Sequence, residues 1–407
     1  MKILLLNQAF VPDTVSSGQH AADLAKALVM MGHDVTVVVS NRGYDRPRAR
    51  FEPREVWNGV NVIRVASTGL GKGARWRRAV DFASFLISCV ARVALLPRFD
   101  LVITMTSPPL LSAAAAALVK LKGGSLICWI LDLNPDQAVV AGWLKPKSLT
   151  CRFLRRMAAF GFHTARWCVV MDRFMAERLE AYEVEVQKIA VIPPWSHDDN
   201  VRYDPGGRDE FRHEHGLEGR FVVMYSGNHS PCHPLDTLLE SARRMKNDAR
   251  VVFCFIGGGS EFPRVKAYAE GHRLRNILCL PYVPLNRLSA SLSAADLHAV
   301  VLGDAYAGVV HPSKVYNVLA LGIPFLYLGP ERSHIMDLAL DPPWMMRASH
   351  GDVDRVTEEI TRAADAPSAA PVAAEQAVAR RYSQSAVLPV FLGVLEAAAH
   401  ADSVCAS

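Results

Sequence analysis

The chain has 407 residues, half of them hydrophobic and 21% charged, which suggests two domains with sizeable cores and excludes a disordered or fibrous protein. Its net charge of +5 is unevenly placed, because residues 1–200 hold 25 Lys and Arg against 17 Asp and Glu, whereas the remainder holds 20 against 23. No nucleic-acid-binding motif accompanies the basic half, so we expect this half to face another anionic partner.

Cysteine usage and the apolar runs indicate a cytoplasmic chain. The eight cysteines form no Cys-x-x-Cys pair and lie mostly in apolar runs, which predicts buried thiols rather than disulfides or metal ligands. The apolar part of "MKILLLNQAFVPD" is too short for a signal peptide and predicts a first strand. The longest apolar segment, 79–96, contains Asp81 and Arg92, so we expect no transmembrane helix.

Strands and helices alternate through the first half of the chain. Apolar strands are predicted at "MKILLLN", "DVTVVVS", "VNVIRVA", "DLVITMTS", "SLICWILD", "WCVVMD" and "KIAVIPP". Helices are predicted between them, in "SSGQHAADLAKALVMMGH" and at 79–96, 110–122, 150–165 and 173–182. Strands that are apolar on both faces are typical of a parallel sheet covered by helices on both sides.

The alternation breaks at the polar stretch 196–209 and then restarts. Strands are predicted at "FVVMYSGN", "VVFCFIG", "NILCLPY", "LHAVVL" and "PFLYLG", with helices at 234–246, 260–270, 285–294, 312–322 and 331–340. A low-complexity linker at 363–374 and a last helix at 383–399 follow.

We therefore predict an α/β protein of two doubly wound, Rossmann-like domains that face each other across a cleft. The first domain is expected at 1–195 and the second at 205–370, with a tail helix at 380–400 that packs back toward the first domain. Ligands of such sheets bind beyond the carboxyl ends of the strands, so functional residues should lie directly after strands.

Three strand ends carry residues suited to an anionic ligand. Gly18, after the first strand, is compatible with a phosphate at a helix N-terminus or simply with a tight turn. His229 and His233 follow a later strand, but Pro231 and Pro234 disfavour a helical zinc pair, so loop donors are the stronger interpretation. The glycines at 257–259 allow close backbone approach or a tight turn.

The stretch "VVHPSKVYNVLALGIP", residues 309–324, places Lys314 at the start of a helix. An ammonium there opposes the helix dipole, by about 0.3–1 kcal/mol, unless an anion occupies the site. The alternative is that Ser313 caps the helix and Lys314 lies in solvent. Because several glycine-rich turns meet at this edge, we favour the anion.

Several motifs resemble the GT-B-fold glycosyltransferases of family 4, especially the bacterial surface-polysaccharide and O-antigen branch. The resemblance covers nearly the whole chain. It rests on "PSKVY" followed by "LALGIP", and on "DLNPD" (132–136), "SPPL" (107–110), "YSGN" (225–228) and "GGG" (257–259). Two features depart from the family pattern. The usual pair of Glu is absent, with Asn317 and Val309 at those positions, and histidines replace the Arg and Lys usual after "GN".

The resemblance implies retaining transfer of a hexosyl or N-acetylhexosaminyl group from a nucleotide sugar, such as a UDP-sugar, to a lipid-linked or polysaccharide-precursor acceptor. It implies no metal and no cofactor. Cationic and N–H donors would stabilise the leaving diphosphate, and a carboxylate would face the developing oxocarbenium ion. We expect Asp132, Asp136 and Lys314 to be catalytic, although both Asp suit turn capping equally well. The expected donor-binding residues are Gly18, Gly227, Asn228, His229, Gly257, Gly258, Tyr282, His311, Ser313, Lys314 and Asn317.

The segment after residue 71 suggests contact with an anionic membrane. Basic side chains (Lys72, Arg75, Arg77 and Arg78) interleave with apolar ones (Trp76, Phe82, Phe85 and Leu86). This pattern favours a peripheral helix on the inner face of the plasma membrane, and the alternative is a core helix with a solvated basic end. A sugar-nucleotide epimerase with the same fold, or an inactive nucleotide-sugar-binding partner, remains an alternative function. A dehydrogenase is disfavoured because no G-x-G-x-x-G fingerprint occurs.

Overall fold

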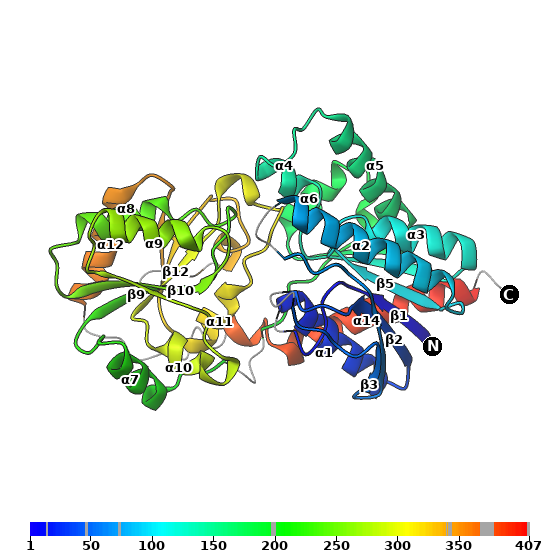
Figure 1. Ribbon diagram of the computed structural model, residues 1–407, viewed down its shortest axis with the longest axis horizontal. Coiled ribbons are helices and arrows are strands. Elements are labelled where there is room, and N and C mark those ends of the chain that lie inside the picture. Colours follow the sequence, from blue (N-terminus) through cyan, green and yellow to red (C-terminus); the bar gives the residue numbers. More distant parts are fainter. Residues whose placement is uncertain are drawn as a thin grey trace. The chain divides into compact units, whose positions relative to one another are not determined.

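The computed structural model describes residues 1–13, 15–44, 48–71, 75–196, 201–338, 340, 344–366 and 378–404. The chain forms two compact units (Figure 1). The first comprises Met1–Pro194, Gly308–Val310 and Leu388–Ser407, and the second comprises Trp195–Ala307 and His311–Val387. In the described part of the chain, no helix is both long and apolar enough to cross a membrane. The seven described cysteines are free, and six of them are buried, as predicted.

The first unit contains an eight-stranded sheet in the order β3-β4-β2-β1-β5-β6-β7-β8. Its strands are β1 (Lys2–Leu6), β2 (Asp34–Ser40), β3 (Arg54–Trp57), β4 (Val60–Val65), β5 (Leu101–Met105), β6 (Ser125–Ile130), β7 (Trp167–Val170) and β8 (Ile189–Val191). All neighbours pair in parallel except β3 and β4, which form an antiparallel hairpin. This hairpin was missed from the sequence. It turns at Asn58 and Gly59, which both have positive φ, the backbone that an Asn-Gly pair adopts readily.

Helices cover both faces of this sheet. They are α1 (Ser16–Met30), α2 (Arg75–Ala94), α3 (Leu111–Lys122), α4 (Asp136–Val140), α5 (Leu149–Thr164), α6 (Arg173–Glu180) and α14 (Gln384–Val404). On one face, Trp129 of β6 contacts His20 of α1 and Phe391 of α14. On the other face, the thiol of Cys128 donates to the Gly161 carbonyl of α5. Cys128 and Trp129, which are adjacent on β6, therefore contact helices on opposite faces of the sheet. Helix α14 lies on the same face as α1.

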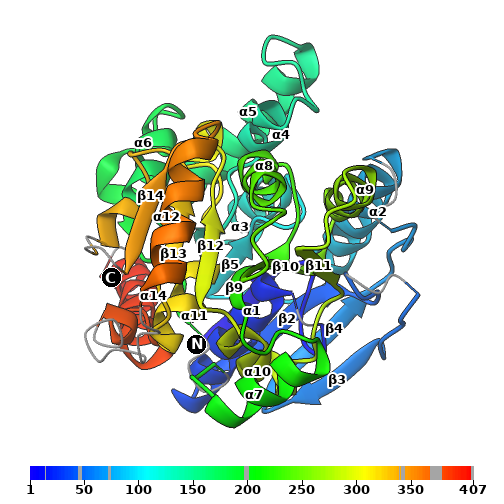
Figure 2. The ribbon, with the colours of Figure 1, turned by 90° about the vertical axis from the view of Figure 1, so that its left-hand side faces the viewer.

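The second unit contains a six-stranded, wholly parallel sheet in the order β11-β10-β9-β12-β13-β14. Its strands are β9 (Phe221–Asn228), β10 (Val251–Gly258), β11 (Ile277–Leu280), β12 (Leu297–Val301), β13 (Phe325–Leu328) and β14 (Met345–Ala348). Its helices are α7 (Pro205–Glu214), α8 (Asp236–Arg244), α9 (Phe262–Gly271), α10 (Leu288–Ser293), α11 (Lys314–Leu321) and α12 (Val353–Asp365). Core residues of α8, α9 and α12 pack on one face and those of α7, α10 and α11 on the other (Figure 2).

Three predictions about the second half were wrong. The stretch 196–209 contains the start of α7, where Pro205 occupies the first turn and the Asp204 side chain accepts from Gly207 N. No α-helix covers the described residues of 331–340, of which Met336–Leu338 form a 3-10 helix. The Tyr327 hydroxyl lies within hydrogen-bonding distance of Pro330 O and Ser333 Oγ at the start of this segment. The linker predicted from 363 begins inside α12, and its residues 367–374 lie outside the described part of the chain.

Candidate active site

Lys314 begins α11, and its environment differs from that of a solvent-exposed lysine. Its Nζ lies 3.6 Å from the centroid of the Tyr225 ring and is buried, with no hydrogen-bond partner among the described residues. Burial lowers the pKa of Lys314 to about 7. Ser313 makes no side-chain cap bond at the helix start. The alternative with a capping Ser313 and a solvated Lys314 is therefore wrong. Buried polar groups are normally hydrogen-bonded, so an unsatisfied ammonium indicates a place for an anion.

Glycines at the ends of β9 and β10 bring the main chain close to this ammonium. Gly227 has φ +132°, and a Cβ on it would lie 3.4 Å from Lys314 Nζ. Gly257 has φ +133°, and a Cβ there would lie only 2.1 Å from the Gly227 carbonyl oxygen. A side chain at Gly257 would therefore force the two strand ends apart, and the lack of a side chain at Gly227 leaves its main chain exposed toward Nζ.

The two histidines after β9 are neutral near pH 7. Burial, and then the charge of Lys314, lower the pKa of His229 to about 4 and that of His233 to about 3. Each Nδ1 lies at hydrogen-bonding distance from a carbonyl oxygen, 3.0 Å to Gly227 for His229 and 2.7 Å to Val301 for His233. In the resulting tautomer Nδ1 carries the proton and Nε2 is an acceptor. His229 Nε2 is buried and has no partner in the described chain.

The turns after β9 and β10 are bonded to each other. The amide of His229 donates to the Gly258 carbonyl at 2.7 Å, and the Tyr225 hydroxyl donates to the Asn228 carbonyl at 2.8 Å. In the described part of the chain, neither His229 nor His233 belongs to a group of three metal-ligating side chains. Both histidines lie in the loop after β9, and each has its Nδ1 at a carbonyl oxygen.

Tyr282, which follows β11, lies next to the glycines. Its ring is 57% exposed, and a Cβ on Gly258 would lie 2.9 Å from the ring carbon Cε2. The ring therefore lies close against the Gly257–Gly258 main chain and leaves much of its surface open to solvent. An exposed aromatic face beside a glycine turn can stack on a planar ligand.

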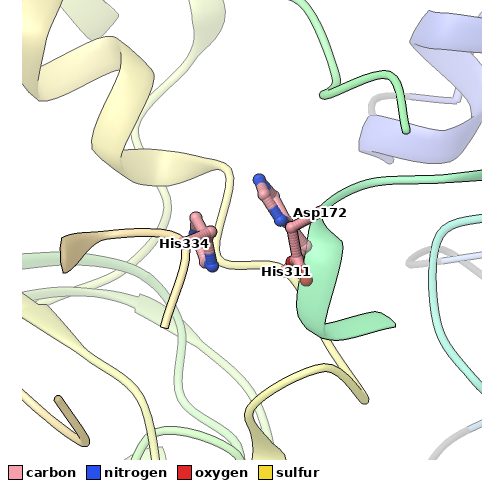
Figure 3. Close-up of side chains that lie close together, drawn as sticks. All are labelled: Asp172, His311 and His334. Atoms are coloured by element: carbon pink, nitrogen blue, oxygen red, sulfur yellow. The ribbon is translucent and has the colours of Figure 1, made fainter. Parts of the chain in front are cut away.

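His311 and Asn317 lie on the chain around Lys314 but have different surroundings. His311 Nε2 is 2.7 Å from the Tyr316 hydroxyl, and its ring stacks on that of His334 with 3.6 Å between the centroids (Figure 3). Tyr316 in turn stacks on Tyr382. His311 is thus part of an aromatic stack, in contrast to the unpartnered Lys314 ammonium. Asn317 lies one turn into α11 and is half-buried.

In the first unit, Asp132 follows β6 and is the better placed of the two predicted acids. Its amide donates to Thr106 Oγ1 at 3.2 Å, and the amide of Leu133 donates to the Val309 carbonyl at 2.8 Å. Burial raises the pKa of Asp132 to about 6, while the positive charge of Arg78 acts in the opposite direction. No described side chain or amide donates to its carboxylate. Asp132 is thus held by its main chain, with its carboxylate available.

Asp136 has a different environment. Its carboxylate accepts from Arg155 Nη2 at 2.6 Å and from the Tyr182 hydroxyl, and its residue is buried. These two partners, from α5 and from the end of α6, use both of its oxygens. The structure therefore gives Asp136 the role of an anchor between helices, and the predicted catalytic role does not fit it.

Gly18 also serves a structural purpose. Its amide donates to the Val15 carbonyl at 2.9 Å, and a Cβ on it would lie 3.2 Å from the Phe10 amide nitrogen. Gly18 therefore lets α1 begin close against the turn after β1. Because its N–H is already bonded, the expected donation from Gly18 to a phosphate has no support in this structure.

Comparisons with known proteins identify related glycosyltransferases. Residues 17–195 match the family model of the glycosyl transferase 4-like domain. The chain is 28% identical over 280 residues to the probable glycosyltransferase WbjE of Pseudomonas aeruginosa, covering 68% of each chain. It is 24% identical over 336 residues to the putative colanic acid biosynthesis glycosyl transferase WcaI of Escherichia coli (strain K12), covering 79% of this chain and 82% of WcaI.

Solved structures with low sequence identity share the fold. A sucrose-phosphate synthase from Thermosynechococcus elongatus matches with a TM-score of 0.77 at 14% identity, covering 100% of both chains. HepE of Anabaena, solved in complex with UDP-glucose, matches with a TM-score of 0.73 at 14% identity, covering 98% of this chain and 100% of HepE. WaaG, a glycosyltransferase involved in lipopolysaccharide biosynthesis, matches with a TM-score of 0.65 at 15% identity over 94% and 95% of the two chains.

Proposed function

Because this chain is a glycosyltransferase of family 4 with the GT-B fold, we propose that it transfers a sugar from a UDP-sugar to a lipid-linked or polysaccharide-precursor acceptor, with retention of the anomeric configuration. The observation that carries the proposal is the buried, unpartnered ammonium of Lys314, which lies over the Tyr225 ring beside Gly227 at the end of β9. The names of WbjE and WcaI, both glycosyltransferases, support the reaction class.

Lys314 is proposed to bind the diphosphate of the donor. Cleavage of the anomeric bond builds negative charge on the leaving diphosphate, so a fixed cation there stabilises the transition state more than the ground state. The site is preorganised, since the ammonium lies at the end of the sheet before any anion arrives. We propose that this charge serves in place of a metal ion. The Nε2 atom of His229 would accept a hydrogen bond from the donor.

The uridine end of the donor is proposed to lie against Tyr282. The exposed ring of Tyr282 offers a stacking face, and Gly257 and Gly258 allow the nucleoside to approach the main chain closely. HepE, which shares the fold, was solved with UDP-glucose, and this supports uridine as the base.

Asp132 is proposed to face the sugar that is transferred. A carboxylate near the anomeric carbon would stabilise the oxocarbenium-like charge of the transition state or orient the acceptor hydroxyl. Its pKa of about 6 leaves it mostly ionised at neutral pH.

Membrane contact is proposed for the outer side of α2. Trp76, Ile87 and Val90 are 62%, 70% and 47% exposed and recur at helical spacing, so an apolar stripe faces outward. Arg77 stands beside Trp76, with its guanidinium carbon 5.5 Å from the ring centroid. An apolar stripe with basic neighbours suits the interface of an anionic bilayer.

The structure leaves fewer residues of this segment available for membrane contact than the sequence suggested. Phe85 is fully buried and therefore belongs to the core rather than to a membrane-facing side. Lys72 lies outside the described residues, and only the main chain of Arg75 is described.

A two-part experiment tests the proposed function. Titration calorimetry with UDP should give binding to the parent protein, and a panel of UDP-sugars should then show which donor is consumed in the presence of lipid-linked acceptors. Absence of UDP binding would contradict the donor assignment. Binding without turnover or hydrolysis of any donor would favour an inactive binding partner, and conversion of the donor without an acceptor would favour an epimerase.

A further inference from the structure

A narrow pocket lies at the carboxyl edge of the sheet of the first unit. Its lining includes residues that follow β1, β2 and β4, among them Gln8, Ser40, Arg42 and Ser67. Arg78, from the first turn of α2, completes it. In a doubly wound sheet, this edge is where ligands bind.

The pocket contains two arginines that form no ion pair with a described carboxylate. Arg42 Nε is buried without a hydrogen-bond partner in the described chain, and no described carboxylate pairs with this guanidinium. Arg78 donates to the Tyr44 hydroxyl at 3.1 Å and lies over the Phe82 ring. It forms no ion pair with a described carboxylate, although its charge acts on Asp132. Two guanidinium groups in one pocket without a carboxylate partner indicate an anion with several oxygen atoms.

The acid that lines the pocket does not neutralise these arginines. Asp81 accepts from Thr68 Oγ1 at 2.5 Å, from Leu70 N at 2.8 Å and from Gly71 N at 2.9 Å. Its carboxylate therefore holds the loop after β4 in place. The bonds of Asp81 shape one wall of the pocket, and no ion pair joins Asp81 to Arg42 or Arg78 in the described structure.

Hydroxyl groups line the rest of the pocket. Ser40 Oγ and Ser67 Oγ are 2.8 Å apart. Behind the lining, Ser107 Oγ donates to Oε1 of the lining residue Gln8 at 3.3 Å. The Arg42 amide donates to Ser40 Oγ at 2.9 Å, which fixes the main chain that carries the guanidinium. A phosphate ester would find donors of two kinds here, charged guanidinium groups and neutral hydroxyls.

We propose that this pocket binds the phosphate or diphosphate group that links the acceptor sugar to its lipid, with Arg42 and Arg78 as the phosphate-binding residues. The inference rests on the proposed function and specifies its acceptor as a phosphate-linked glycolipid. Arg78 connects the pocket to the reaction, because its charge acts on the Asp132 carboxylate. Arg78 also belongs to α2, whose exposed apolar stripe would receive the lipid chain.

The test uses farnesyl diphosphate as the probe, titrated into the full-length protein at saturating UDP so that the donor site is already filled. The parent should bind the probe, and Arg42→Gln should weaken this binding about tenfold or more while the affinity for UDP stays unchanged. Arg42→Lys, which keeps the charge, should bind the probe with an affinity between those of the parent and Arg42→Gln. Arg54→Gln, an exposed arginine of β3, is the matched control and should bind as the parent does.

The outcomes separate this inference from the proposed function. If the parent binds UDP but not farnesyl diphosphate, or if Arg42→Gln binds both as the parent does, the acceptor pocket is wrong and the donor site stands. If the probe displaces UDP from the parent, its diphosphate has bound at the nucleotide site and the pocket is likewise overturned. If UDP does not bind at all, the proposed function fails, whereas loss of probe binding in Arg42→Gln would still support a phosphate pocket. Circular dichroism checks the fold of each variant, and Arg78→Gln repeats the test if Arg42→Gln does not fold.

Discussion

The two units of this protein each place an ionisable side chain near the carboxyl edge of a parallel sheet, but the charges are opposite. In the second unit burial lowers the pKa of Lys314 to about 7, and in the first unit burial raises that of Asp132 to about 6. Both groups are therefore destabilised in their charged forms. A ligand of the complementary charge would restore each charge, so the ligand-free protein is poised for a diphosphate at one edge and for a developing cation at the other.

The two edges also differ in how they hold their charged group. Lys314 lacks any described hydrogen-bond partner and lies over an aromatic ring, whereas Asp132 has Arg78 close enough to oppose the rise of its pKa. The comparison teaches that the second unit is the more dependent on its ligand. Substitutions should therefore cost more at Lys314 than at Asp132.

The largest effect is expected for Lys314→Met. Removing the ammonium should weaken UDP binding by about ten- to a hundredfold and should lower transfer by about a further hundredfold or more, because the lost charge matters most as the diphosphate leaves. Isothermal calorimetry and an acceptor assay measure the two effects. Lys246→Met, an exposed lysine of the same unit, is the matched control and should behave as the parent does. Equal UDP affinity in Lys314→Met and the parent would contradict the assignment of an anion site to Lys314 in the second unit.

A smaller effect, specific to turnover, is expected for Asp132→Asn. The neutral amide keeps the shape but not the charge, so we expect kcat to fall by about ten- to a hundredfold with little change in UDP affinity. Steady-state kinetics with varied donor and acceptor measure this. Parental turnover in Asp132→Asn would reduce Asp132 to a turn residue.

Asp136→Asn is the matched comparison four residues along the chain. It weakens the bonds to Arg155 and Tyr182 and should lower the free energy of unfolding by about 1–2 kcal/mol, with turnover per folded molecule unchanged. Thermal denaturation followed by circular dichroism measures the stability. A loss of turnover without a loss of stability in Asp136→Asn would reverse the roles that the structure gives to the two acids.

The alternating pattern of strands and helices predicted most of both sheets, because strands that are apolar on both faces leave few other architectures. The hairpin of β3 and β4 was missed although Asn58 and Gly59 are a strong turn signal, since β3 is short and half-exposed and only β4 was predicted. The start of α7 was missed because its polar residues suggested a linker. The sequence signal for the start of this helix was Asp204 followed by Pro205.

The site residues that follow strand ends could be predicted from the sequence. The roles that depend on burial and packing could not. Lys314 was identifiable from its place at a helix start, but its position over the Tyr225 ring depends on packing between distant segments. The distinction between Asp132 and Asp136 was also inaccessible, because Tyr182 reaches Asp136 from 46 residues away. Arg42 gave no sequence signal, since a single arginine in a polar loop is ordinary until a pocket leaves it without a partner.

The pH dependence of UDP binding sharpens the comparison further. Lys314 has a lowered pKa in the free protein, and a bound diphosphate should raise it, so binding takes up a proton above pH 7. UDP affinity should therefore be greatest near pH 7 and fall, by up to about tenfold per pH unit, as the pH rises above that value. His229 and His233, with pKa values of about 4 and 3, do not titrate in this range.

Calorimetry in buffers of different ionisation enthalpy measures this proton uptake directly. In Lys314→Met the slope above pH 7 should disappear, while Lys246→Met should keep it. A parental affinity that is flat between pH 7 and 9 would show that the ammonium stays charged without its ligand, and the poised state inferred for the second unit would then be wrong.

The smallest effect concerns the outer side of α2, where the first unit would meet the membrane. Replacing Trp76 and Ile87 with Ser removes two exposed apolar side chains and should reduce binding to phosphatidylglycerol vesicles about three- to tenfold, while leaving activity on a soluble acceptor intact. Sedimentation with vesicles measures the bound fraction. Val56→Ser removes an equally exposed side chain from the β3 edge and should leave vesicle binding unchanged.

Binding of the parent to vesicles should also weaken as salt is added or as neutral lipid replaces anionic lipid, because Arg77 contributes by its charge. If the parent protein does not sediment with anionic vesicles at low salt, the stripe on α2 serves another contact and the first unit reaches its acceptor without the bilayer.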